Sequence, residues 1–310
     1  MEKLLPWSST FSKKQNEWLT KLKAFTYELF IQKKLAFFLT GLLLGRAVIL
    51  YDISPFAIAF IATIWMLRGE RLFTIVLFCL IGAWSYSLLQ GIWLTLVLSI
   101  FGIMTLFVKK RMHVKLVMVL VFCAPFVTRL FLFSITNQLT LYHWLYMLME
   151  ASLAVVLLLI FLQSVPLFTM KPYERKIKNE ELICVIILFA SLLTGLVGWE
   201  LYSLALEHVF SRYIVLVIAF VGGAALGSTV GVVAGLILSL ANIANLYQMS
   251  LLAFSGLLGG LLKEGSKLGV SSGLILGSVL LGLYSDATSF TATMFETVLA
   301  ILLFYMTPKE

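Results

Sequence analysis

Charged side chains are scarce in this sequence. They make up 12% of its 310 residues and hydrophobic side chains make up 61%, whereas a soluble domain has about 25% and 45–50%, respectively. A water-soluble globule, a secreted domain and a disordered chain are excluded, because so much apolar surface could not be hidden from water. A helix needs about 20 apolar residues to cross the hydrocarbon of a bilayer. The composition therefore predicts an all-α, polytopic integral membrane bundle in contact with lipid.

Residues that build catalytic and metal sites are also few. There are three cysteines without a CxxC spacing, three histidines without metal-ligand spacing, and two aspartates, Asp52 and Asp286. No Walker, HExxH or Rossmann motif is present. Metal-assisted phosphoryl chemistry needs several converging carboxylates, and the glutamates at 174, 180 and 181 in one basic linker do not provide them. We therefore expect no catalytic residue, cofactor, metal or nucleic-acid partner for this chain.

Apolar runs separated by polar breaks predict about ten transmembrane helices. Their approximate limits are 35–50, 54–67, 72–88, 91–108, 115–135, 143–168, 182–198, 213–240, 269–285 and 291–306. The region 213–262 leaves two alternatives. One crossing with a re-entrant pair gives ten spans in all, three short crossings give twelve, and we favour ten.

Basic residues indicate which side of the membrane each connection faces. All but three of the 23 Lys and Arg residues lie at the N-terminus, at the C-terminus or in every second connection. The exceptions are Arg46 and Arg129, inside predicted spans, and Arg212, in a connection predicted to lie on the outer side. Connections rich in Lys and Arg stay in the cytoplasm. Both termini and the linker 171–181 are therefore predicted to be cytoplasmic.

Composition divides the chain into four parts. These are a cytoplasmic amphipathic segment (1–34), an aromatic-rich six-span bundle (35–168), a cytoplasmic linker (169–181) and a glycine-rich bundle of about four spans with a re-entrant segment (182–310). In the first part, apolar residues recur at helical spacing with lysines between them. This pattern predicts a helix lying on the inner leaflet, with a partner-docking helix as the alternative.

Glycines in the last part recur at every fourth residue. Such spacing forms a smooth stripe along a helix, where a second backbone can approach closely. We therefore predict helix packing through these residues, and a glycine-lined solute pathway is the alternative. The set is Gly223, Gly227, Gly231, Gly235, Gly256, Gly260, Gly269, Gly273 and Gly277.

Four ionisable residues fall inside predicted spans: Arg46, Arg129, Glu150 and Glu296. Charges in the membrane are costly and are usually paired. Arg129 and Glu150 lie about equally far from one short loop, so consecutive antiparallel helices would bring them to the same depth. We predict an Arg129–Glu150 ion pair. Arg46 and Glu296 form a second candidate pair, although Arg46 could instead reach Asp52. A proton or ion pathway, or a ligand site, is the alternative for both.

Three stretches resemble a known family. They are GRAVILYDISPFAIAF (45–60), IFLQSVPLFT (160–169) and TVGVVAGLILSLANIANLYQMSLLAFSGLLGGLLKEGSK (229–267). The chain is similar, from about residue 35 to 308, to the N-terminal membrane region of the stage II sporulation protein E family.

The resemblance implies a function beyond the membrane. In that family, a ten-span membrane region precedes a cytoplasmic oligomerisation region and a PP2C-type serine phosphatase, which uses Mn or Mg. The phosphatase dephosphorylates an anti-anti-sigma factor and so activates a forespore sigma factor. The protein gathers at the asymmetric septum through the cell-division GTPase FtsZ. This sequence stops at Glu310, where the cytoplasmic part would begin, so no phosphatase residue can be assigned here.

We therefore predict a bacterial plasma-membrane domain that anchors and localises a cytoplasmic phosphatase. The alternative is a transporter or a small-molecule-binding membrane bundle, because the interrupted 213–262 region is typical of discontinuous helices at such sites. Against it, the aromatic-rich and glycine-rich halves do not resemble each other as inverted repeats would.

Overall fold

The computed structural model describes residues 35–50, 52–67, 72–107, 113–135, 140–169, 179–201, 204–242, 246–283 and 287–307. These residues are almost entirely helical, so the predicted all-α class is confirmed. A short antiparallel hairpin, β1 (Glu200–Leu201) and β2 (Leu204–Ala205), joins two of the helices. The amphipathic segment predicted over 1–34 and most of the predicted linker, 170–178, lie outside the described residues.

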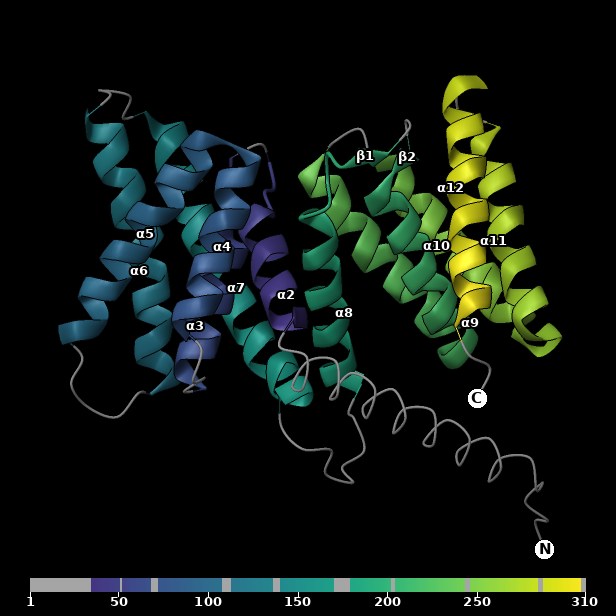
Figure 1. Ribbon diagram of the computed structural model, residues 1–310, viewed down its shortest axis with the longest axis horizontal. Coiled ribbons are helices and arrows are strands. Elements are labelled where there is room, and N and C mark those ends of the chain that lie inside the picture. Colours follow the sequence, from purple (N-terminus) through teal and green to yellow (C-terminus); the bar gives the residue numbers. More distant parts are fainter. Residues whose placement is uncertain are drawn as a thin grey trace, which may run out of the picture.

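Two groups of helices lie side by side, with α8 between them (Figure 1). The first group surrounds α3, in which residues 55–64 are all buried. A helix that is apolar on every face belongs in the interior of a bundle, and α3 accordingly forms the centre of the largest hydrophobic cluster. The helices of the first group are α2 (Leu35–Arg46), α3 (Pro55–Met66), α4 (Leu72–Tyr86), α5 (Leu88–Phe107), α6 (Val114–Ile135) and α7 (Leu141–Thr169). Helix α8 (Asn179–Thr194) follows them between the two groups.

The second group follows the hairpin. It contains α9 (Leu206–Ala241), α10 (Leu246–Leu261), a 3₁₀ turn (Leu262–Gly265), α11 (Ser266–Gly282) and α12 (Ala287–Met306). Helix α9 is not a single rod, because Gly223 adopts φ 77° and ψ −167° in its middle. Residues with a side chain rarely adopt such a positive φ, whereas glycine does so at no steric cost.

The two arms of α9 fold back on each other at Gly223. A Cβ atom on Gly227 would lie 3.0 Å from the Cα atom of Ala219, although eight residues of straight helix span about 12 Å. The turn lies beside the side chain of Lys263. At the other end of the second arm, the Leu50 N–H donates to the carbonyl oxygen of Leu240 at 2.8 Å.

The region 213–262 forms three antiparallel arms: the two arms of α9, and α10. Three arms fit both sequence alternatives, the favoured single crossing with a re-entrant pair and the three short crossings. The sequence does contain a signal for the turn at Gly223, namely the pair Gly222–Gly223, since adjacent glycines allow a sharp turn that other residues resist. The regular glycine spacing hid it, because Gly223 also continues the four-residue repeat.

Among the described residues, five helical stretches are long and apolar enough to cross a membrane, judged by length and composition. They are Leu88–Leu106, Val114–Ile135, Leu141–Leu167, Leu206–Ala241 and Tyr247–Gly282. Each of the last two spans 36 residues and reverses direction, at Gly223 and at the 3₁₀ turn, so each supplies two arms. Shorter apolar helices are Pro55–Met66, Leu72–Tyr86 and Phe290–Met306.

Glycines lie where α9, α10 and α11 touch. A Cβ atom on Gly227 would be 2.5 Å from the carbonyl oxygen of Gly256, and one on Gly256 would be closer still to that of Gly227. The same kind of contact joins Gly231 to Leu252. The remaining stripe residues face neighbouring backbone or side-chain atoms in the same way: Gly235 faces Met249, Gly260 faces Ala224, Gly269 faces Leu262, Gly273 faces Gly259 and Gly277 faces Ser255. These helices therefore approach as closely as their backbones allow.

We predict that Gly256→Ala lowers the thermal midpoint of the purified chain in detergent. Its methyl group would have to push the carbonyl of Gly227 away, and overpacking costs about 1–3 kcal/mol. Gly102→Ala in α5 is the matched control, because a Cβ atom there meets nothing within 4 Å. The control should keep or raise the midpoint, since alanine favours a helix by about 1 kcal/mol over glycine. Equal midpoints for the two variants would contradict the close contact.

Candidate functional site

Arg129 of α6 and Glu150 of α7 form an ion pair. Arg129 Nε lies 2.8 Å from Glu150 Oε2, and the two side chains are 13% and 1% exposed. The structure thus brings together the two residues that the loop distances placed at one depth. A charge removed from water needs such a partner, since stranding one of the pair costs about 3–5 kcal/mol.

Nearby backbone groups make further hydrogen bonds to both side chains of this pair. Glu150 Oε1 accepts from the backbone N–H of Ser54 at 3.3 Å, and Arg129 Nη2 donates to the carbonyl oxygen of Asp52 at 2.6 Å. Ser54 precedes the first residue of α3, where unpaired N–H groups favour a carboxylate. The pair therefore fixes the start of the central helix to α6 and α7.

Aromatic rings enclose the guanidinium of Arg129. Its Cζ atom lies 4.8 Å from the ring centroid of Trp93 and 5.3 Å from that of Tyr146. Rings at this distance attract a cation through their quadrupole. Because Trp93 belongs to α5, four helices meet at this one charge.

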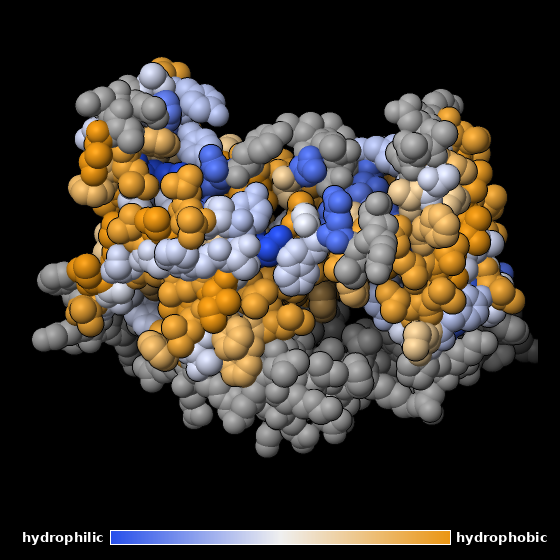
Figure 2. All heavy atoms as spheres, turned by 45° about the horizontal axis from the view of Figure 1, so that its top comes forward, coloured by the Kyte–Doolittle hydropathy of each residue, from blue (hydrophilic) through white to orange (hydrophobic). Residues whose placement is uncertain are grey.

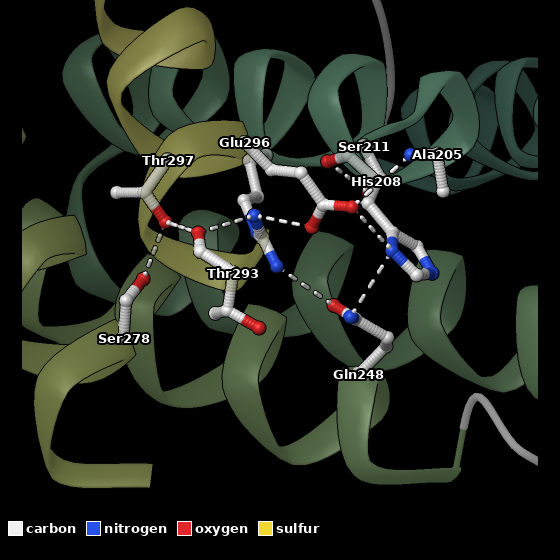
Figure 3. Close-up of polar contacts among 9 residues, drawn as sticks. Ala205, His208, Ser211, Gln248, Ser278, Thr293, Glu296 and Thr297 are labelled. Carbon is white, nitrogen blue, oxygen red and sulfur yellow. Dashed lines mark hydrogen bonds and ion pairs between the residues drawn. The ribbon is translucent and has the colours of Figure 1, made fainter. Parts of the chain in front are cut away.

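A second cluster centres on Glu296 of α12. Its Oε2 atom lies 2.8 Å from Arg212 Nη1 and its Oε1 atom lies 3.1 Å from His208 Nδ1. Oε1 also accepts from the backbone N–H of Ala205, in strand β2, at 3.2 Å. Figure 3 shows Glu296 and Gln248 reaching toward His208.

Arg212 links this cluster to two further helix segments. It is fully buried; Nη1 donates to the carbonyl oxygen of Thr293 at 3.0 Å and Nη2 to Gln248 Oε1 at 3.4 Å. Deeper along α12, the Thr297 hydroxyl donates to Ser278 Oγ of α11 at 3.0 Å (Figure 3). Polar contacts therefore join α9, α10, α11 and α12.

The predicted Arg46–Glu296 pair is wrong. Arg46 ends α2 and donates to the carbonyl oxygens of Ser85 at 3.3 Å and Val197 at 3.4 Å, with its Cζ 5.0 Å from the Trp199 ring centroid. Glu296 instead pairs with Arg212. Equal depth in the membrane does not identify the partner of a charged residue when the two helices are distant in sequence. For Arg129 and Glu150, the short loop between consecutive helices identified it.

Two buried cations were missed from the sequence. Arg212 was read as a residue of an outer connection, although His208 and Arg212 lie four residues apart and so share one helix face. Lys267 was counted among the loop lysines, but it lies in the first turn of α11 and is 3% exposed. Its position at the end of the short polar run 263–267 concealed its burial.

No reactive or metal-holding arrangement is evident in the part of the chain that the structure describes. Within it, no three His, Cys, Asp or Glu side chains are grouped so that they could hold a metal ion. Cys79, Cys123 and Cys184 are free thiols. What the buried charges can do chemically is to hold helices at fixed positions.

Comparison with known proteins identifies the family. The family model described as SpoIIE, N-terminal domain, matches residues 2–310. The chain belongs to this family. The resemblance seen in the sequence is thereby confirmed.

Two relatives carry the name stage II sporulation protein E. The protein of Bacillus subtilis (strain 168) is 43% identical over 289 residues, which are 92% of this chain and 35% of that protein. The protein of Priestia megaterium is 60% identical over 82 residues, which are 26% of this chain and 14% of that protein. The chain thus spans about a third of the length of the first relative. No solved structure matches it.

We predict that Arg129 and Glu150 are energetically coupled. Arg129→Met and Glu150→Gln should each destabilise the chain, and the double variant should lose less than the sum by about 0.5–3 kcal/mol. Thermal unfolding in detergent measures the cycle. The control combines Arg129→Met with Thr297→Val, a distant polar contact, and should be additive. Additivity for Arg129 with Glu150 as well would show that the ion pair does not form.

Proposed function

We propose that this chain is the membrane anchor and localising domain of a sporulation protein. The apolar exterior is the observation that carries this proposal. Large hydrophobic side chains stand exposed all along the outer helices, among them Phe73, Leu89, Leu141, Phe295 and Met306. Figure 2 shows hydrophobic residues over the flanks, while hydrophilic ones gather in the middle of the face nearest the hairpin. Lipid covers such flanks at no cost, whereas water does not.

The arms of the structure support a specific topology. The described residues form seven arms from α2 to α8, two in α9, and one each in α10, α11 and α12. If each of these twelve arms crosses the membrane, their even number would place both ends of the chain on one side, as ten crossings would. We place that side in the cytoplasm because of its Lys-rich connections. The three basic residues that depart from this pattern are Arg46, Arg129 and Arg212. All three are held by protein groups.

The proposal extends to the activity of the whole protein. By family resemblance, the cytoplasmic continuation would be a PP2C-type serine phosphatase that uses Mn or Mg and acts on an anti-anti-sigma factor. Localisation at the asymmetric septum would involve FtsZ and self-association. The division of this chain into an aromatic-rich bundle and a glycine-rich bundle would serve anchoring. These roles belong to the proposal, and none of the contacts described above tests them.

The transporter alternative loses the feature that favoured it. Discontinuous helices suit a binding site when the break lies near the middle of the membrane. Here the break at Gly223 lies beside Lys263, at the end of the bundle where α10 terminates. Below the Glu296 cluster, apolar residues of α9, α11 and α12 fill the interior, including Leu216, Leu274 and Phe304.

A C-terminal fusion to green fluorescent protein tests the proposal in a sporulating bacterium that lacks its own copy. The reporter fluoresces only when it folds in the cytoplasm, so we expect fluorescence, concentrated at the asymmetric septum. A fusion to residues 1–168 alone is the matched control for the contribution of the second bundle. Absence of fluorescence despite full-length membrane protein would contradict the cytoplasmic C-terminus. Even fluorescence around the whole membrane would contradict localisation by this domain.

A further inference from the structure

The end of α12 is held by a buried lysine. Lys267 Nζ, from the first turn of α11, donates to the carbonyl oxygen of Phe304 at 3.2 Å and to that of Thr307. It also lies 3.4 Å from the Thr307 hydroxyl and 5.3 Å from the ring centroid of Phe304. The last carbonyls of a helix have no partner within the helix, and a cation there also complements the helix dipole.

The opposite half of the same helix is held by a buried carboxylate. Glu296 contacts Arg212 and His208 in α9, and it accepts from the backbone N–H of Ala205 in the hairpin. Between the two ends, Ala300 is fully buried against α9 and α11. Helix α12 therefore carries one charged attachment at its middle, another at its C-terminal end, and close apolar packing between them.

Among α9, α11 and α12, helix α12 has the sequence that is least prone to bend. Its sequence, ATSFTATMFETVLAILLFYM, contains neither glycine nor proline, whereas α9 bends at Gly223 and α11 contains four glycines. Kinks in helices arise mostly at proline and glycine. A displacement at one end of α12 would thus move the other end with it.

We propose that Lys267 is a positioning residue that fixes where, and in which direction, the polypeptide leaves the membrane after α12. The inference rests on the proposed anchoring function, in which a cytoplasmic region follows. About two thirds of the Bacillus subtilis relative lies outside the matched part, so the exit from α12 would set the starting point of a large region. Through Glu296, the same helix ties this exit to the hairpin on the opposite face.

A distance measurement on the full 310-residue chain tests the role of Lys267. Spin labels are placed at Glu264→Cys and Met306→Cys, which are both exposed, after the three native cysteines are replaced by alanine. Electron–electron double resonance in nanodiscs then reports the distance between the 3₁₀ turn and the end of α12. We expect one narrow distribution for the parent chain. Lys267→Met should lose the single narrow peak, because the carbonyls of Phe304 and Thr307 lose their donor.

Three variants complete the design. Lys267→Arg keeps a cation with several donors and should therefore give a narrow peak. If Lys267 only filled volume, a cation at this position would not be needed for the narrow peak. Lys115→Met removes an exposed lysine of α6 at the same end of the bundle and should leave the peak unchanged. Where Lys267→Met does not fold, Lys267→Leu, which also lacks a donor, is read instead, with the same expected loss of the narrow peak.

The outcomes separate this inference from the anchoring proposal. A narrow, unshifted peak in Lys267→Met or Lys267→Leu would overturn the positioning role while leaving the anchor intact. Membrane extraction of the same variants reports anchoring independently. Chains that carbonate washes off the membrane would refute the anchor itself.

Discussion

The bilayer interior offers no water to charged groups, so every buried charge must find its partner within the chain. Each buried charge described here meets that requirement differently. Glu150 pairs with Arg129 and receives the N–H of Ser54 at the start of α3. Glu296 pairs with Arg212 and His208, while Lys267 binds helix-end carbonyls. Because each of these contacts joins different helices, the charges fix the helix positions that apolar packing alone would leave free to slide.

Glycine contacts and charges act on different parts of the structure. Close backbone approach at Gly227 and Gly256 holds α9 against α10, and the Arg212–Glu296 pair attaches α12 to that unit. In the first group, large apolar side chains around α3 fill the core. An anchor of this construction presents hydrophobic flanks to lipid.

Composition and local spacing predicted much of this structure. Apolar runs identified the helices, and the short loop between α6 and α7 identified the Arg129–Glu150 pair. Contacts between distant helices were not predictable in this way. Arg46 and Glu296 share no short loop, so equal depth did not imply contact, and Arg212 was read as a loop residue. The turn at Gly223 depends on a positive φ, which a regular glycine repeat does not reveal.

The fold-back of α9 is central to this structure, because it turns one long apolar helix into two antiparallel arms that pack against α10. Cysteine labelling tests it most directly. In a background without Cys79, Cys123 and Cys184, single cysteines replace Ala225, beside the turn, and Asn242, at the end of the second arm; both positions are exposed. A membrane-impermeant maleimide added to intact cells should label Asn242→Cys at once, and Ala225→Cys only after permeabilisation. Labelling of both positions from the same side would contradict the account.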